Sequence, residues 1–143
     1  MLDFRRLNRL RREAEVALKV IEDATSRPLN LFLNDFKIVF AVRYAIVQVV
    51  EACTLMGIHI LEEVFNEAPE AYKDVFRELA RLNVIDENTA NNMIKLVGLR
   101  NLVVHRYWEV DDSLIYKNAR ESGIGSIKTF IDEVIKYAAK HKG

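Results

Sequence analysis

The chain has 143 residues, of which 50% are apolar and 29% are charged, a balance that favours a folded domain with a sizeable core over a disordered chain. Its 5 glycines and 2 prolines are too few for a turn-rich β-sandwich or barrel, so long helices are expected. The 21 basic and 21 acidic residues cancel, so binding to nucleic acid or to an anionic membrane would need a local basic patch.

Residues 3–26 are expected to form the first helix, which Pro28 ends. Apolar residues recur at steps of three and four and so draw one stripe along the helix. The stripe consists of Leu7, Leu10, Ala14, Leu18 and Ile21. The first turns carry Arg5, Arg6, Arg9, Arg11 and Arg12, which form either a solvated charged face or a patch that faces RNA or a partner.

Residues 29–65 are expected to form a second helix, buried at the centre of a bundle. Polar residues interrupt it, so no stretch approaches the ~18–20 apolar residues that cross a bilayer, and no membrane association is expected. Two of these residues, Arg43 and Glu51, lie eight positions apart and share one half of the helix surface. Because buried charges are costly unless paired or functional, they either belong to a structural ion pair or a solvent-facing strip, or line a functional cleft.

Two helices are expected between residues 69 and 108. Pro69 suits a first helical turn, and an apolar stripe runs from Tyr72 to near Asn83. Asp86 is a candidate N-cap for the next helix, whose apolar spacing continues toward Trp108.

A last helix is expected after a turn at Gly123 and Gly125, with Ser126 as its N-cap. The sequence shows no repeat, low-complexity tract or linker, so residues 1–143 are interpreted as a single helical domain. The expected fold is all-α, an antiparallel, up-and-down bundle of four or five helices.

Most signals of metal or cofactor chemistry are missing from the sequence. There is no H-E-x-x-H spacing, and Asp111 and Asp112 near His105 are interpreted as helix caps rather than metal ligands. The single cysteine, Cys53, is expected to be buried and excludes an intrachain disulfide and a cysteine-based zinc site. The chain starts without the apolar stretch of a signal peptide, so a cytoplasmic protein without metal or cofactor is expected.

Residues 99–108 differ from the rest of their helix because they concentrate polar side chains. Asn101 and His105 are four apart and share a face, while Arg100 and Tyr107, seven apart, form a second stripe. Arg100 and His105 are about 140° apart around the helix, so they could flank one cleft only if the arginine reached around it or a second copy contributed. From the residues alone, a hydrogen-bonded structural cluster remains the alternative.

The order Arg100, four residues, His105, one residue, Tyr107, followed by Trp108, resembles the signature of HepT-type toxins of the HEPN superfamily. Residues 97–99, the helix from Arg43 to Glu51, residues 69–79 and the closing helix fit the same family, so the resemblance covers nearly the whole chain. It implies an all-α homodimer whose two motifs meet in a cleft, a metal-independent ribonuclease activity, and a minimal nucleotidyltransferase partner that acts as antitoxin.

The resemblance implies a role for each motif residue. His105 would be general acid or base for attack of the RNA 2′-hydroxyl on the adjacent phosphate, and Arg100 would hold and stabilise that phosphate. Asn101 would orient the imidazole or the phosphate. Tyr107 would be the hydroxyl that the partner adenylylates to inhibit the toxin. Arg43 and Glu51 are expected to support the site.

Two alternatives to a ribonuclease toxin remain open. The bundle could be a non-catalytic subunit that binds a nucleotide or is the substrate of a nucleotidyltransferase, with the same arginine and histidine holding a phosphate. It could also be a purely structural helical dimer, but this alternative gives the polar motif no role.

Overall fold

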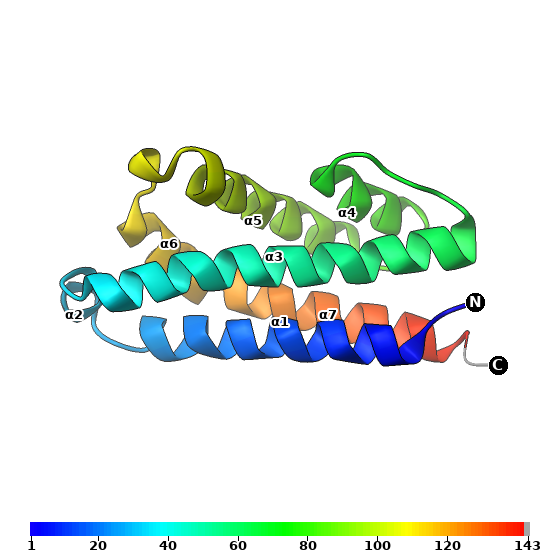
Figure 1. Ribbon diagram of the computed structural model, residues 1–143, viewed down its shortest axis with the longest axis horizontal. Coiled ribbons are helices and arrows are strands. Elements are labelled where there is room, and N and C mark those ends of the chain that lie inside the picture. Colours follow the sequence, from blue (N-terminus) through cyan, green and yellow to red (C-terminus); the bar gives the residue numbers. More distant parts are fainter. Residues whose placement is uncertain (142–143) are drawn as a thin grey trace.

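The computed structural model describes residues 1–141, and these residues form helices and no strand. The two remaining residues of the expected domain, 142 and 143, lie outside the described part. Figure 1 shows the helices of more than 15 residues running alternately in opposite directions. The α-helices are α1 (Phe4–Thr25), α2 (Leu29–Leu33), α3 (Phe36–Phe65), α4 (Tyr72–Arg81), α5 (Glu87–His105), α6 (Asp112–Asn118) and α7 (Ile124–Ala139). The all-α prediction is confirmed, because five of them correspond to the main helices expected and α2 and α6 are short.

The first helix follows its predicted stripe. Asp3 caps α1 by accepting a hydrogen bond from the backbone N–H of Arg6, and all five stripe residues are buried. The backbone N–H of Asp3 donates to Nε2 of His59 at 2.8 Å, so this buried histidine on α3 fixes the start of α1.

The predicted second helix is broken near its start. Asn34 ends the short α2, and Asp35 caps α3 by accepting hydrogen bonds from the backbone N–H groups of Lys37 and Ile38. The sequence prediction of one continuous helix over residues 29–65 was therefore wrong, because an aspartate in an extended conformation starts a new helix.

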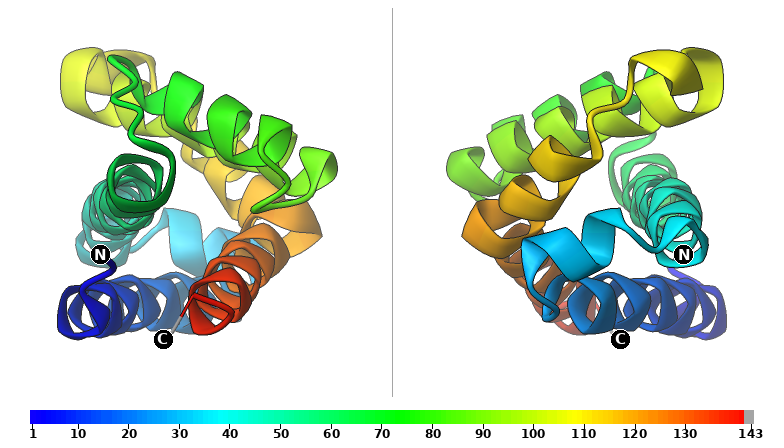
Figure 2. Two further views of the ribbon diagram at one scale, coloured as in Figure 1. Left: turned by 90° about the vertical axis from the view of Figure 1, so that its right-hand side faces the viewer. Right: turned by 90° about the vertical axis from the view of Figure 1, so that its left-hand side faces the viewer.

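Helix α3 is the central element, in contact with α1, α4, α5 and α7. Figure 2, which looks along the bundle, shows α1 and α7 side by side, α3 next to α1, and the α4–α5 pair closing the opposite side. By length and composition α3 could cross a membrane, since an 18-residue stretch reaches a mean hydropathy of 1.7. Half of that stretch is buried against the other helices, as in the core helix of a bundle.

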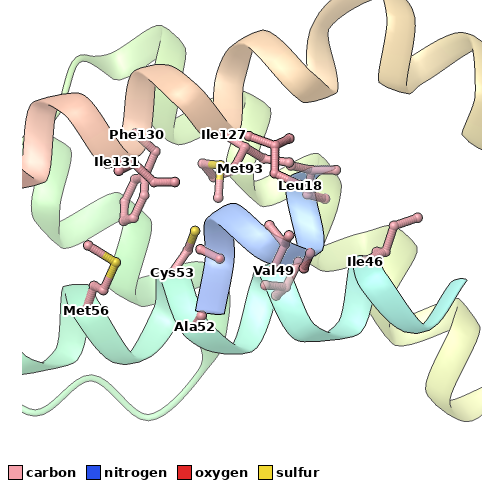
Figure 3. Close-up of a cluster of buried hydrophobic side chains, with 14 of the residues drawn as sticks. Leu18, Ile46, Val49, Ala52, Cys53, Met56, Met93, Ile127, Phe130 and Ile131 are labelled. Carbon is pink, nitrogen blue, oxygen red and sulfur yellow. The ribbon is translucent and has the colours of Figure 1, made fainter. Parts of the chain in front are cut away.

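The core forms around the middle of α3 (Figure 3). Cys53 and Met56 are fully buried there, and Phe76 of α4 packs edge-on against Phe130 of α7, with ring centroids 5.4 Å apart. Burial raises the pKa of the Cys53 thiol to about 12. The thiol is therefore protonated at neutral pH, and Cys53 acts as a small core residue rather than as a nucleophile.

The C-terminal third corrects three sequence predictions. Gly123 and Gly125 do not form a turn, because a π-helical turn over Ala119–Gly123 joins α6 to α7 without a break. Ser126 lies buried inside α7 and caps nothing. Helix α5 is shorter than the sequence predicted. It ends at His105, and Trp108 lies in a short 3₁₀ helix, Tyr107–Glu109.

Candidate active site

The polar motif lies at the C-terminal end of α5 and in the turn that follows it. Arg106 leaves the helical conformation, with φ −142° and ψ 49°, so His105 is the last residue of α5. The His105 side chain is exposed and makes no hydrogen bond within the described part of the chain. Asn101, four residues earlier on the same face, is exposed as well. An imidazole in this position is available to a bound molecule.

Arg100 points instead toward α3 and α4, where its side chain is only 16% exposed. Its Nη2 donates to Oε1 of Glu51 at 2.7 Å, and its Nη1 donates to Oδ1 of Asn101 at 3.0 Å. The guanidinium lies over the ring of Tyr72, 4.7 Å from the centroid. The Tyr72 hydroxyl donates to Oε2 of Glu51 at 2.7 Å, so the two side chains hold the arginine from two sides.

This environment affects Tyr72 itself. The hydrogen bond to Glu51, together with burial, raises the pKa of the Tyr72 hydroxyl above its ordinary value, so the group stays a neutral donor. The buried Nε of Arg100 has no hydrogen-bond partner in the structure.

Tyr107 lies on the other side of the motif, in the 3₁₀ helix after α5. Its side chain is exposed and packs edge-on against the ring of Trp108, with centroids 5.4 Å apart. Its backbone carbonyl accepts a hydrogen bond from Nη1 of Arg43 at 3.4 Å. Arg43 in turn donates to both carboxylate oxygens of Asp112, at 2.9 and 2.8 Å, and this pairing raises the pKa of the Arg43 guanidinium. The turn that carries Tyr107 is thereby tied to α3 and α6.

The two charged residues of α3 that the sequence singled out do not pair with each other. Glu51 binds Arg100 of α5, and Arg43 binds Asp112 of α6. Both therefore form ion pairs between helices beside the motif. Sequence reasoning missed Tyr72, and it interpreted both Asp111 and Asp112 as caps. Only Asp111 caps α6, by accepting hydrogen bonds from the backbone N–H groups that follow it.

An exposed aromatic surface adjoins the motif, and we call it the aromatic face. Phe36 packs against Phe40 one turn later on α3, and the Arg43 guanidinium lies 5.7 Å from the centroid of the Phe40 ring. Arg43 connects this stripe to the Tyr107 turn through the carbonyl described above. The aromatic face consists of Phe36, Phe40, Tyr44, Tyr107 and Trp108, all of which are exposed.

The arginines of the first helix lie elsewhere. Arg5, Arg6, Arg9 and Arg12 are exposed around a hollow of about 600 Å³ at the start of α1, and Arg11 pairs with Glu15. In Figure 1 this start of α1 and the C-terminal end of α5 lie toward opposite ends of the bundle. Within residues 1–141, no group of three or more histidine, cysteine or acidic side chains is arranged to hold a metal ion.

The chain is similar to known nucleases. The profile of the family described as Ribonuclease HepT-like matches residues 14–134. The chain is 29% identical over 103 residues to the mRNA nuclease HepT of Shewanella oneidensis, covering 72% of this chain and 77% of that protein.

Solved structures are similar as well. The tri-AMPylated HEPN toxin of Shewanella oneidensis, in complex with MNT antitoxin, matches with a TM-score of 0.83 and 27% identity over 95% of this chain and 98% of that one. A cytosolic protein of unknown function from Bacillus subtilis shares the fold with a TM-score of 0.85 at 16% identity, covering 99% of this chain and 94% of that one.

Proposed function

The chain belongs to the ribonuclease HepT-like family, and from this premise we propose that it is the ribonuclease toxin of a toxin–antitoxin pair, acting without a metal ion. The observation that carries the proposal is the arrangement of the motif on α5, with an unpaired, exposed His105 at the end of the helix and an Arg100 that is held by a carboxylate and an aromatic ring. The proposed location is the cytoplasm, where the RNA substrate is.

His105 supplies the proton transfer in the proposed reaction. The RNA 2′-oxygen forms a bond to the adjacent phosphorus as its proton passes to a base, and the bond from phosphorus to the 5′-oxygen breaks as that oxygen gains a proton. The products are a 2′,3′-cyclic phosphate and a free 5′-hydroxyl. An exposed imidazole suits either proton transfer, because one ring nitrogen can accept a proton and the other can donate one.

Arg100 binds the phosphate and stabilises the charge that grows on it in the transition state. Its guanidinium has five N–H donors, and the protein uses one on each terminal nitrogen. One further N–H on each terminal nitrogen is left for a phosphate, which arginine binds with two parallel hydrogen bonds. Asn101, which contacts Arg100 and shares the exposed face of His105, orients these groups.

Tyr107 is the proposed site of inhibition by a nucleotidyltransferase partner. Support comes from the similar HEPN toxin of Shewanella oneidensis, which is AMPylated and in complex with MNT antitoxin. The Tyr107 side chain is exposed, and the Arg43 guanidinium holds its turn in place by donating a hydrogen bond to the backbone carbonyl of Tyr107. An added nucleotide brings bulk and negative charge next to His105, where both oppose the entry of RNA.

A homodimer is part of the proposal, with the aromatic face at its interface. Arg100 points to α3 and α4 while His105 is exposed at the end of α5, so one protomer does not bring both side chains to one point. Exposed clusters of large aromatic residues are typical of interfaces between proteins. A second copy docked on this face would add its own motif to the same cleft.

The test is incubation of total cellular RNA with the purified protein in EDTA, followed by analysis of the fragment ends. Wild type should produce fragments with 2′,3′-cyclic phosphate, and His105→Ala should produce none. The matched control is His141→Ala, which removes an exposed histidine at the end of α7 and should cleave like wild type. Cleavage by His105→Ala would contradict the role given to His105.

Intact RNA with wild type would favour the alternative, a nucleotide-binding or substrate subunit of a nucleotidyltransferase. Mass spectrometry of the same preparation must then show Tyr107 unmodified, because an adenylylated toxin would also leave RNA intact. Tight binding of a nucleotide by the unmodified protein would complete the case for that alternative.

A further inference from the structure

Tyr72 makes two separate contacts with the pair formed by Arg100 and Glu51. The guanidinium carbon of Arg100 lies over the Tyr72 ring, 4.7 Å from its centroid. The Tyr72 hydroxyl donates to Oε2 of Glu51, the carboxylate oxygen that Arg100 does not contact. The three side chains come from α3, α4 and α5 and close into a ring of contacts. No motif residue other than Arg100 takes part in this ring.

Both contacts restrict the guanidinium more than the ion pair alone. Glu51 accepts a hydrogen bond from Nη2 of Arg100, and Asn101 accepts one from Nη1. The Tyr72 ring adds a third contact, because it covers one face of the guanidinium and so restricts its rotation further. Arginine side chains carry ~2 kcal/mol of rotamer entropy, so an arginine that is already fixed loses less on binding phosphate.

The hydrogen bond from the Tyr72 hydroxyl also affects how strongly the negative charge of Glu51 acts on Arg100. A carboxylate beside Arg100 offsets the positive charge that a phosphate would meet. The Tyr72 hydroxyl shares the negative charge of Glu51, so less of it acts on the arginine. Because this hydrogen bond is partly buried, the effect is stronger than it would be in bulk water.

Close packing of α4 on α3 puts Tyr72 in place. Tyr72 is the first residue of α4, and Val75 and Leu79 further along α4 pack directly against Gly57 of α3. A side chain at Gly57 would meet Val75 at 2.7 Å, so only glycine allows this approach. The approach brings the Tyr72 hydroxyl within reach of Glu51, less than two turns earlier on α3.

We propose that Tyr72 is a positioning residue of the ribonuclease reaction, which acts through Glu51 and by stacking to hold the Arg100 guanidinium in the orientation that binds the scissile phosphate. The proposal rests on the ribonuclease function proposed above. Tyr72 touches neither His105 nor Tyr107, so its effect is expected on transition-state stabilisation rather than on proton transfer.

The test compares Tyr72→Phe, which keeps the ring, with Tyr72→Leu, which removes both contacts, in cleavage of a short RNA in EDTA. Tyr72→Phe should lower kcat about tenfold, as loss of one hydrogen bond to a charged group does, and leave KM within about twofold. Tyr72→Leu should lower kcat further. The matched control is Tyr137→Phe on α7, which removes a hydroxyl that binds nothing in the described chain and should leave both constants unchanged.

A second measurement separates positioning from a loss of folded protein. The nitrogen NMR signals of the Arg100 guanidinium, assigned with Arg100→Lys, should show hindered rotation in wild type and in Tyr137→Phe. They should average in Tyr72→Leu, which lacks the ring, and stay hindered in Tyr72→Phe, which keeps it, while the remaining backbone spectrum of both variants stays as in wild type. Hindered rotation in Tyr72→Leu, or an unchanged kcat in either variant, would overturn the proposal.

The outcomes also distinguish this proposal from the proposed function. If wild type cleaves RNA and the Tyr72 variants cleave equally well, the positioning role is wrong and the ribonuclease function stands. If unmodified wild type does not cleave, the ribonuclease function is wrong and the positioning role in it fails too.

Discussion

At the scale of single residues, Arg43 and Glu51 show what the sequence could and could not predict. Their spacing placed both on one half of the central helix. Their partners could not be predicted, because Asp112 lies 69 residues from Arg43 and Arg100 lies 49 residues from Glu51. Periodicity describes one helix at a time, and these ion pairs depend on how three helices pack together.

Replacement of Arg43 by alanine should destabilise the fold by about 2 kcal/mol, since it leaves the carboxylate of Asp112 partly buried without its partner. The two side chains are only 18% and 20% exposed, so water replaces the lost contact poorly. Urea unfolding would measure the change. The control is Arg77→Ala, which breaks an exposed pair with Asp74 and should change stability by less than about 0.5 kcal/mol. Equal effects of the two substitutions would contradict the argument.

At the scale of helices, the predictions succeeded where an apolar stripe is long and failed at the break before α3 and at the π-helical turn before α7. The α1 stripe is buried as expected. Gly123 and Gly125 were interpreted as a turn before the last helix because they lack the strand and the further residues of a phosphate-binding loop, and glycine is a poor helix former. Tertiary packing overrides that preference here, and one π-helical turn carries the chain from α6 into α7.

The contact between α3 and α4 allows a sharp test at Gly57. Gly57→Ala should destabilise the protein by about 1–3 kcal/mol, because the added methyl group would overlap the side chains of Val75 and Leu79. Gly125→Ala is the control, since its methyl group would meet no atom within 4 Å. This second variant should be more stable than wild type by up to about 1 kcal/mol. Thermal unfolding of both variants measures the difference, and a stable Gly57→Ala would show that α4 shifts easily.

At the scale of the whole molecule, the resemblance implied a dimer that a single chain could not display. Residue patterns predicted the helices and the polar motif, yet they gave no position for a second copy, because the exposed aromatic residues of α3 follow the same helical spacing as core residues. Only the fold distinguishes them, by leaving Phe36, Phe40 and Tyr44 uncovered.

Phe40→Asp should therefore raise the dissociation constant of the dimer at least about tenfold, since it places a charge in the middle of an apolar interface. Light scattering across micromolar concentrations would measure it, and RNA cleavage should fall in proportion to the dimer lost. Val16→Asp on the exposed side of α1 is the control and should leave assembly unchanged. A monomeric Phe40→Asp with full activity would show that each chain holds a complete site.

Chemical labelling of the buried Cys53 thiol measures how readily the bundle opens. Its pKa of about 12 and its complete burial leave almost no thiolate at neutral pH and no path for a reagent. Alkylation must therefore wait until α3 separates from its neighbours. The labelling rate, followed by mass, reports the free energy of that opening. Since the chain has one cysteine, each molecule is labelled once. The rate at which Cys53 is alkylated therefore shows how often the folded core opens.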